Sequence, residues 1–305
     1  NKLIPEFLFY CLLFKKDELI KKATGNAQPN ISQKKIKDTK IPLILLEEQK
    51  QIVAILDEAF EGIDKAIENA EKNLANAREI FESYLNSIFI NKGDDWVEKK
   101  LGDVCEFKNG INFDKTQKGN QGILTVDVLN MYSENNYLSL DSLYRVDKEI
   151  KKDYLLKKGD LLFVRSSVKR EGVGWAAYFP DFFESVTFCG FIIRARIIEK
   201  FIIDPDFLVY YFRSKRSREE IIAKAKQATI TNINQGLLSE LLITYPVHKK
   251  QIQIITTINE LKEETQRLET IYKRKIEALK ELKQSILQKA FTGELTNPDF
   301  KKDAA

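Results

Sequence analysis

The sequence predicts an α+β protein in which a globular mixed α/β domain accompanies two long helices that form an antiparallel coiled coil. Three observations predict this class. A stretch of roughly sixty residues recurs 202 positions later in the chain without a gap. Each copy ends in a long proline-free segment whose apolar residues are spaced alternately by four and three, as in a coiled coil. The block between the copies, residues 92–205, instead holds short β-rich runs separated by turn residues.

The repeat is defined by residue pairs that keep one register. The matched pairs include Asn30 with Asn232, Ile41 with Ile243, Gln49 with Gln251, Glu58 with Glu260 and Phe89 with Phe291. Further upstream, after a small gap, residues 7–10 resemble residues 207–210. Chance matches do not hold one register over such a length, so two similar units frame one unrepeated block.

Long helices are predicted from about residue 47 to residue 91 and from about residue 249 to residue 291. The first seam includes Leu56, Phe60, Ile63 and Tyr84. The second includes Leu282, and polar Thr265 interrupts it. At 1.5 Å per residue each helix would be on the order of 65 Å long. Neither can bury its apolar stripe alone, so we expect the two to pack together. They are either pure scaffold or also a docking surface, since one partner seldom covers faces of this length.

The middle block predicts a compact sheet-containing domain. Its β-rich runs are residues 122–129, 160–165, 173–179 and 185–196. A helix follows from residue 207 towards residue 225, and Asp206 is its expected N-cap.

Composition limits the classes of protein that remain. The 305 residues carry 49 basic and 45 acidic side chains, a net charge of +4, so any contact with nucleic acid must come from local patches. No run approaches the roughly 20 apolar residues of a membrane span, so we expect a cytoplasmic protein without a membrane partner. Cys11, Cys105 and Cys189 are far apart and odd in number, which favours reduced thiols. The only methionine is Met131, so we expect upstream residues to be missing.

No group of residues has the spacing of a catalytic, cofactor-binding or metal site. The single histidine, His248, cannot build a metal site with partners so scattered. We therefore predict no catalytic residue, no cofactor and no metal.

Basic segments precede an asparagine-containing loop in both repeats. Six positive charges lie between Arg213 and Lys226, and the first repeat is equally rich in lysine before and after Asn30. Such a run is usually a solvated helix face. Here basic groups that neutralise phosphates, together with amides that can read adenine edges, also suit duplex DNA. The candidate DNA-binding residues are Lys108, Asn109, Lys115, Lys118, Arg165, Ser166, Lys169, Arg170, Arg216, Lys226, Thr231, Asn232, Asn234, Asn30 and Lys34.

Arg165, Lys169 and Arg170 follow a predicted buried strand, so the turn after it should project them together. The alternative for Arg165 is an ion pair with Asp160 or Glu171.

The order of motifs along nearly the whole chain resembles the specificity subunit of type I restriction-modification enzymes. The motifs are Trp96 with Leu-Gly-Asp-Val at 101–104, Gly-Asp-Leu-Leu-Phe-Val-Arg at 159–165, the asparagine-isoleucine loops, Ile-Pro-Leu at 41–43 followed by Glu-Glu-Gln at 47–49, and Leu-Gln-Lys-Ala-Phe-Thr-Gly at 287–293. The resemblance implies a non-catalytic subunit whose target recognition domains each read half of a bipartite DNA sequence. It also implies an antiparallel coiled coil that sets their spacing and carries the methyltransferase subunits.

Under this resemblance the chain divides into five parts. They are a C-terminal remnant of a first recognition domain (1–46), a first long helix (47–91), a complete recognition domain (92–246), a second long helix (247–292) and a charged tail (293–305). Either an upstream piece has been lost, or the chain is a half-length subunit that pairs with a second copy of itself.

The partners implied are double-stranded DNA, methyltransferase (modification) subunits and, through them, a restriction/translocase subunit. Two alternatives stay open from the residues alone. One is the recognition end of a larger fused methyltransferase/nuclease polypeptide, and the other is a structural coiled-coil adaptor.

Overall fold

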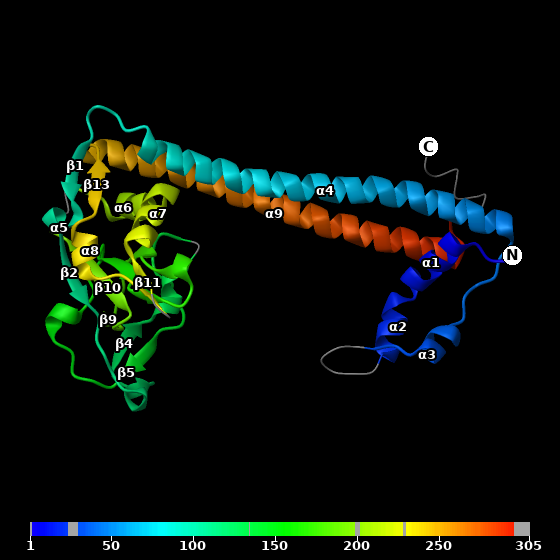
Figure 1. Ribbon diagram of the computed structural model, residues 1–305, viewed down its shortest axis with the longest axis horizontal. Helices are drawn as coiled ribbons and strands as arrows, with labels where there is room; N and C mark the ends of the chain where they lie inside the picture. The colour runs from blue at the N-terminus through cyan, green and yellow to red at the C-terminus, as the bar shows by residue number, and fades with distance from the viewer. Residues whose placement is uncertain (1, 24–29, 134, 199–201, 228–229, 296–305) are drawn as a thin grey trace. The chain divides into compact units, whose positions relative to one another are not determined.

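The computed structural model describes residues 2–23, 30–133, 135–198, 202–227 and 230–295, and the chain divides into two compact units. We call Asn1–Arg78 with Thr265–Ala305 the N-terminal unit, and Glu79–Glu264 the central unit. Two long helices, α4 (Leu46–Ile90) and α9 (His248–Thr292), contribute to both (Figure 1). The predicted class is confirmed, because sheets and short helices accompany a long antiparallel helix pair.

The antiparallel direction of α4 and α9 follows from their ion pairs within the N-terminal unit. Arg78 contacts Glu269, and Asp64, earlier on α4, contacts Lys283, later on α9. The buried residues of the pair include Leu56, Phe60, Ile63, Ile258 and Ile276. The predicted seam is wrong at two positions, because the side chains of Tyr84 and Leu282 are exposed. Polar Thr265, expected to interrupt the seam, is buried in it.

The N-terminal unit adds three short helices to one end of this pair. They are α1 (Pro5–Phe14), α2 (Lys16–Lys22) and α3 (Gln33–Lys37). Proline at the first turn suits the start of α1 because its missing N–H would have no helical partner there. The core of the unit is formed by Phe7, Tyr10, Cys11, Ile52, Leu56, Phe60, Leu287 and Ala290.

The central unit carries the strands found in the described residues. In chain order they are β1 (Val97–Lys100), β2 (Cys105–Asn109), β3 (Lys118–Gly119), β4 (Ile123–Val126), β5 (Tyr144–Val146), β6 (Leu161–Val164), β7 (Ser166–Ser167), β8 (Ala176–Tyr178), β9 (Val186–Phe188), β10 (Ile192–Ile197), β11 (Lys226–Gln227), β12 (Thr231–Asn232) and β13 (Leu242–Tyr245). Its short helices are α5 (Leu101–Val104), α6 (Pro205–Arg213), α7 (Lys215–Lys224) and α8 (Gln235–Ser239).

These strands form sheets ordered β1-β13, β2-β10-β6-β8, β11-β12-β7 and β3-β5-β4-β9. Among the paired strands of the described residues, β4 and β9 run parallel and the others run antiparallel. Strands β6 and β10 are buried along nearly their whole length, and α6 packs six consecutive buried residues beside them. A second core, around Met131, Leu162 and Phe188, fills the space next to the β3-β5-β4-β9 sheet.

Three local predictions need correction. The single helix expected from residue 207 towards residue 225 is two helices, α6 and α7, separated at Ser214. The run 185–196 is two strands, because the chain turns at Gly190 and passes from the sheet of β9 to the sheet of β10. The N-cap of the following helix is Asp204 rather than Asp206, since the Asp204 carboxylate accepts the backbone N–H of Asp206 at 2.8 Å. Proline at position 205 then starts the helix.

Matching glutamines anchor the starts of both long helices. The Gln49 side chain donates to the carbonyl oxygens of Ile44 (2.8 Å) and Lys2 (3.0 Å), and accepts from the Ile4 N–H (3.0 Å). In the second repeat Gln251 has the corresponding contacts. It donates to the carbonyl oxygens of Pro246 and Ile202, both at 2.8 Å, and accepts from the Asp204 N–H at 2.9 Å. Both side chains are fully buried.

We expect Gln251→Ala to lower the free energy of unfolding by about 3–5 kcal/mol, because it strands two carbonyls and one N–H without a partner. Chemical denaturation followed by circular dichroism measures this. The control is Gln253→Ala, an exposed position on the same helix, which should change stability by no more than about 0.5 kcal/mol. Equal stabilities of the two variants would contradict the anchoring role.

The ion pair between the long helices predicts a pH dependence. Hydrogen bonds from Arg78, at 2.9 and 3.0 Å, and from Lys273 lower the pKa of Glu269 from 4.5 to about 2. A lowered pKa contributes stability above the ordinary value, and that contribution is lost as the pH falls from 4.5 towards 2. The stability difference between the wild type and Glu269→Gln should therefore be largest above pH 5 and shrink through this window. A difference that stays constant from pH 6 to pH 2 would exclude this role, and Arg78→Ala should reproduce the behaviour of Glu269→Gln.

Candidate nucleic-acid interface

The small sheet β11-β12-β7 brings together residues that are far apart in the chain. Lys226 is the register partner of Asn232, which is in turn the partner of Ser166. The Ser166 hydroxyl donates to the Asn232 Oδ1 at 2.5 Å, and the Asn232 Nδ2 donates to the carbonyl of Ile230 at 3.0 Å. Lys226 and Asn232 are exposed. A polar amide and a cation thus share one row of this sheet, with the amide held in a defined orientation.

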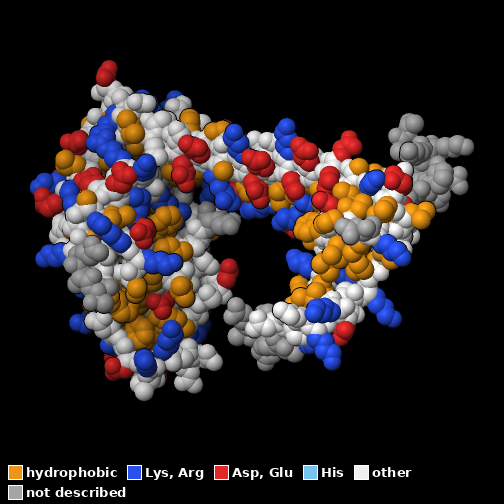
Figure 2. All heavy atoms as spheres, turned by 45° about the vertical axis from the view of Figure 1, so that its right-hand side comes forward, with side chains coloured by type: hydrophobic (Ala, Val, Ile, Leu, Met, Phe, Trp, Pro, Cys, Tyr) orange, Lys and Arg blue, Asp and Glu red, His pale blue; other side chains and the backbone are white. Residues whose placement is uncertain are grey.

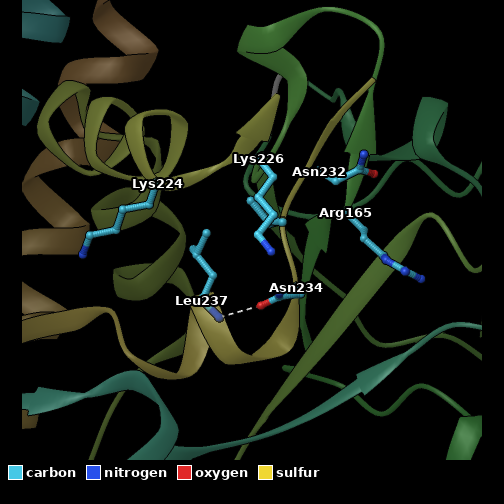
Figure 3. Close-up of a pocket in the computed structure, with 7 residues that line it drawn as sticks. Arg165, Lys224, Lys226, Asn232, Asn234 and Leu237 are labelled. Atoms are coloured by element: carbon cyan, nitrogen blue, oxygen red, sulfur yellow. Dashed lines mark hydrogen bonds between the residues drawn. The ribbon is translucent and has the colours of Figure 1, made fainter. Parts of the chain in front are cut away.

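A cavity of about 520 Å³ opens beside this row (Figure 3). Its lining residues are Arg165, Lys224, Lys226, Asn232, Ile233, Asn234 and Leu237. Lys226 and Asn234 point towards each other, whereas Lys224 extends away from them (Figure 3). Among the described residues that line the cavity there is no carboxylate, and three are cationic, although Glu220 pairs with Lys224 at 2.6 Å.

Arg165 is held by the backbone around it. Its Nη1 donates to the Gly190 carbonyl at 3.2 Å, and its own carbonyl accepts from the Ile233 N–H. The alternative pairing with Asp160 does not occur, because the Asp160 carboxylate is buried and accepts from Arg196 at 2.6 Å. Arg165 thus lines the cavity without an ion pair to Asp160, and its guanidinium points away from Lys226 and Asn234 (Figure 3).

The turn after β7 exposes two further cations. Lys169 and Arg170 lie at the surface, and within the described residues neither makes an ion pair. The buried side chain of Arg218 holds the backbone of this turn, because its Nη2 donates to the carbonyls of Glu171 (2.6 Å) and Val173 (2.7 Å). Lys169 and Arg170 thus project from a turn whose backbone is held by hydrogen bonds.

Asn234 caps a helix, a structural role that the sequence analysis did not predict. Its Oδ1 accepts the backbone N–H of Leu237 at 2.8 Å, so it is the N-cap of α8. At the matching place in the first repeat, Ser32 caps α3 by accepting from the Lys35 N–H. The cap uses one of the two acceptor sites of Oδ1, so the second site and the Nδ2 group can serve another partner.

The basic run 213–218 is only partly a surface. Arg213 and Arg218 lie over the ring of Trp175, with their Cζ atoms 4.7 and 5.7 Å from its centroid, and burial lowers the pKa of each to about 10. The expectation that this whole run offers charge to phosphates is therefore wrong for these two residues. Arg216, from the same run, is exposed.

The remaining predicted residues do not join the cavity. Lys108 pairs with Asp153, and Lys118 lies 3.8 Å from Asp127 and 3.7 Å from the ring centroid of Tyr144. Thr231 points into the domain and is only 4 % exposed, so its hydroxyl is not at the surface.

Four other predicted residues lie away from this row as well. Asn109 has a buried Oδ1 without a hydrogen-bond partner, and Lys115 is exposed on a separate single-turn helix. Asn30 and Lys34, both exposed, belong to the N-terminal unit.

Sequence reasoning also missed residues beside the small sheet. Val168 and Phe191 are strongly exposed, and with Tyr132 and Trp175 they line a second cavity of about 730 Å³. The sequence signal that could have identified this cavity is Val168, a single apolar residue within the polar stretch 165–170.

The described residues show neither a metal-binding group nor an activated thiol. Within them, no group of three His, Cys, Asp or Glu residues could hold a metal ion. Burial raises the pKa of Cys11 to about 11, and of Cys105 and Cys189 to about 12, so at neutral pH these thiols are protonated and weakly nucleophilic. Of the helices seen in these residues, none combines the length and the apolar composition that a membrane span requires.

The structure thus combines a long antiparallel helix pair with a mixed α/β unit that bears a basic, amide-containing surface. The chain matches the type I restriction modification DNA specificity domain over residues 1–76 and 93–280, and it belongs to this family.

Individual relatives agree with this assignment. The chain is 26 % identical to the type I restriction enzyme MjaVIII specificity subunit of Methanocaldococcus jannaschii over 239 residues, which cover 72 % of this chain and 55 % of that protein. It is 23 % identical to the EcoBI specificity subunit of Escherichia coli over 309 residues, covering 89 % and 63 %. A solved structure described as showing complex assembly and conformational transition of the type I R-M system superimposes with a TM-score of 0.76 at 20 % identity, covering 95 % and 71 %. The chain thus spans little more than half the length of these two curated relatives.

The capping geometry predicts different outcomes for two neighbouring asparagines. Asn234→Ala should lower the free energy of unfolding by about 1 kcal/mol through loss of the cap, whereas Asn234→Asp should retain most of it. Asn232→Ala, at an exposed position, should change stability by no more than about 0.5 kcal/mol. Thermal unfolding of the three variants measures this, and equal losses for Asn232→Ala and Asn234→Ala would contradict the assigned roles.

Proposed function

We propose that this chain is the non-catalytic DNA-recognition subunit of a type I restriction-modification complex. In this role it reads part of a bipartite target and docks the methyltransferase subunits. The observation that carries the proposal is the surface formed by the cavity around Asn232 and the turn that follows β7. It combines exposed cations with a fixed amide, and no carboxylate lines the cavity.

The cations suit the DNA backbone. Arg165, Lys169, Arg170 and Lys226 come from two segments that β7 and β12 join, so their charges act on one local surface. The net charge of the chain is only +4, which makes such local concentration necessary for phosphate binding.

Asn232 suits a base edge. Its Oδ1 accepts from Ser166 and its Nδ2 donates to Ile230, so the amide plane is set by the protein, and one Nδ2 hydrogen remains for an acceptor on a base. A fixed donor of this kind distinguishes base pairs more sharply than a mobile lysine does.

Docking of the methyltransferase subunits is assigned to the long helices. The two helices pack against each other, with ion pairs such as Asp64 with Lys283 between them, and the faces turned away from this contact are exposed on both helices. Through these subunits the complex would recruit a restriction/translocase subunit. If the chain is natively half-length, a second copy would supply the other half-site.

The proposal is tested by salt titrations of DNA binding by the chain co-purified with its modification subunits. The target is first obtained by base-resolution mapping of adenine methylation in cells with and without the protein. Arg170→Ala should weaken binding to cognate and scrambled duplexes alike, and reduce the slope of log affinity against log salt by about one. Asn232→Ala should cost roughly 1–3 kcal/mol on the cognate duplex only and leave the slope unchanged.

Glu281→Ala, an exposed position on α9, serves as the control and should alter neither quantity. Identical slopes and identical sequence preference in both test variants would place the DNA on another face. Absence of any sequence preference in the wild-type complex would refute the proposed function itself.

A further inference from the structure

An apolar cavity lies next to the polar row of the small sheet. It measures about 730 Å³, and its lining includes Tyr132, Val168, Trp175, Phe191 and Ile230. Val168 is 83 % and Phe191 60 % exposed, an unusual exposure for two large hydrophobic side chains beside each other. Ser166 also lines this cavity and bonds to Asn232, which lines the basic one, so the two cavities adjoin.

The floor of the apolar cavity is rigid. The Trp175 indole N–H donates to the Met131 carbonyl at 3.0 Å, and its ring lies beside Tyr132, with centroids 6.1 Å apart. The guanidinium groups of Arg213 and Arg218 also lie over this ring. A cavity with so many fixed contacts keeps its shape before any partner arrives.

The charges around the cavity select the kind of occupant. Lys169 and Glu171 lie on its rim. Arg165, Arg170 and Lys226 lie nearby on the two segments joined by β7 and β12, so cations outnumber the single carboxylate. Figure 2 shows lysine, arginine and hydrophobic side chains interspersed on the visible face of the central unit. This excess of cations would not strengthen the binding of an apolar partner helix, whereas it would attract the phosphates of the DNA backbone. On the DNA, the apolar group offered at the edge of the major groove is the C5-methyl of thymine.

We propose that Val168 and Phe191 are specificity-determining residues that contact thymine methyl groups in the half-site read by the central unit. The inference rests on the proposed DNA-recognition function and adds a second kind of readout to it. Asn232 reads hydrogen-bonding atoms, and the apolar cavity reads methyl groups next to them. The half-site must therefore contain at least one A·T pair.

The test replaces thymine by uracil, which removes only the methyl group. The complete complex with its modification subunits is titrated against duplexes that carry the mapped target with single thymine-to-uracil replacements. With the wild type, at least one replacement should weaken binding about fourfold, the effect of losing one buried methyl-sized group. With Val168→Ala or Phe191→Ala, the same replacement should have no further effect, because the contact is already lost.

Matched controls are available in the same chain. Val247→Ala and Phe183→Ala make the same chemical changes at exposed positions that do not line the cavity, and they should keep the full uracil effect. Because all four positions are exposed, none of these variants should unfold the protein.

Two results would overturn the inference while leaving the proposed function intact. One is a uracil effect of equal size in the wild type and in the Val168 and Phe191 variants, and the other is a wild-type complex that prefers its target but loses no affinity with any uracil replacement. Loss of the modification subunits during purification of Phe191→Ala, with the uracil effect retained, would assign the cavity to a protein partner instead. Failure of the wild-type complex to prefer any sequence would refute the proposed function and not merely this readout.

Discussion

The buried glutamine at the start of each long helix is the constraint on which both repeats depend. A fully buried amide must satisfy its hydrogen-bonding groups inside the protein. Gln49 and Gln251 do so with backbone atoms of the loop that precedes their helix and of the segment that leads into α1 or α6. One side chain thereby fixes where the long helix begins and where the preceding short helix starts. The short helices are tied again further along, since Tyr10 donates to Asp57 and Tyr210 donates to Asn259.

Packing of the aromatic residues makes the two repeats mutually dependent. Phe7, from the first repeat, contacts Phe291 at the end of the second long helix, with ring centroids 5.6 Å apart. Phe207, from the second repeat, contacts Phe89 at the end of the first long helix at the same 5.6 Å. Each short helix therefore packs against the end of the other repeat's long helix. A change in the length of one long helix would disrupt its pairing unless the other changed equally, which accounts for a repeat of the long segment without a gap.

The sequence predicts those parts of the structure that local periodicity determines. The long helices, the fold class and the repeat all follow from patterns within the chain, and matched side chains such as Gln49 and Gln251 have matched contacts. Burial is harder to predict, because it depends on residues far away in sequence. Arg213 and Arg218 look like surface charges until Trp175 and the carbonyls around Glu171 are placed beside them. The row of Lys226, Asn232 and Ser166 likewise exists only because β12 pairs with strands from two other segments, and no local pattern encodes that register.

Buried arginines connect the candidate interface to the long helices. Arg218 holds the turn that carries Lys169 and Arg170, and the Arg213 Nε donates to the Ala176 carbonyl on β8. The helix that carries Arg218 is itself tied to α4, because the Lys215 N–H donates to the Asn86 side chain at 2.6 Å. A guanidinium with a pKa of about 10 stays charged at neutral pH, so these carbonyl contacts offset the cost of burying it. The backbone of the turn is thus set by buried residues, while its exposed side chains make few contacts that the fold requires. Substitutions at the exposed positions can therefore change the chemistry of this surface without disturbing the backbone of the turn.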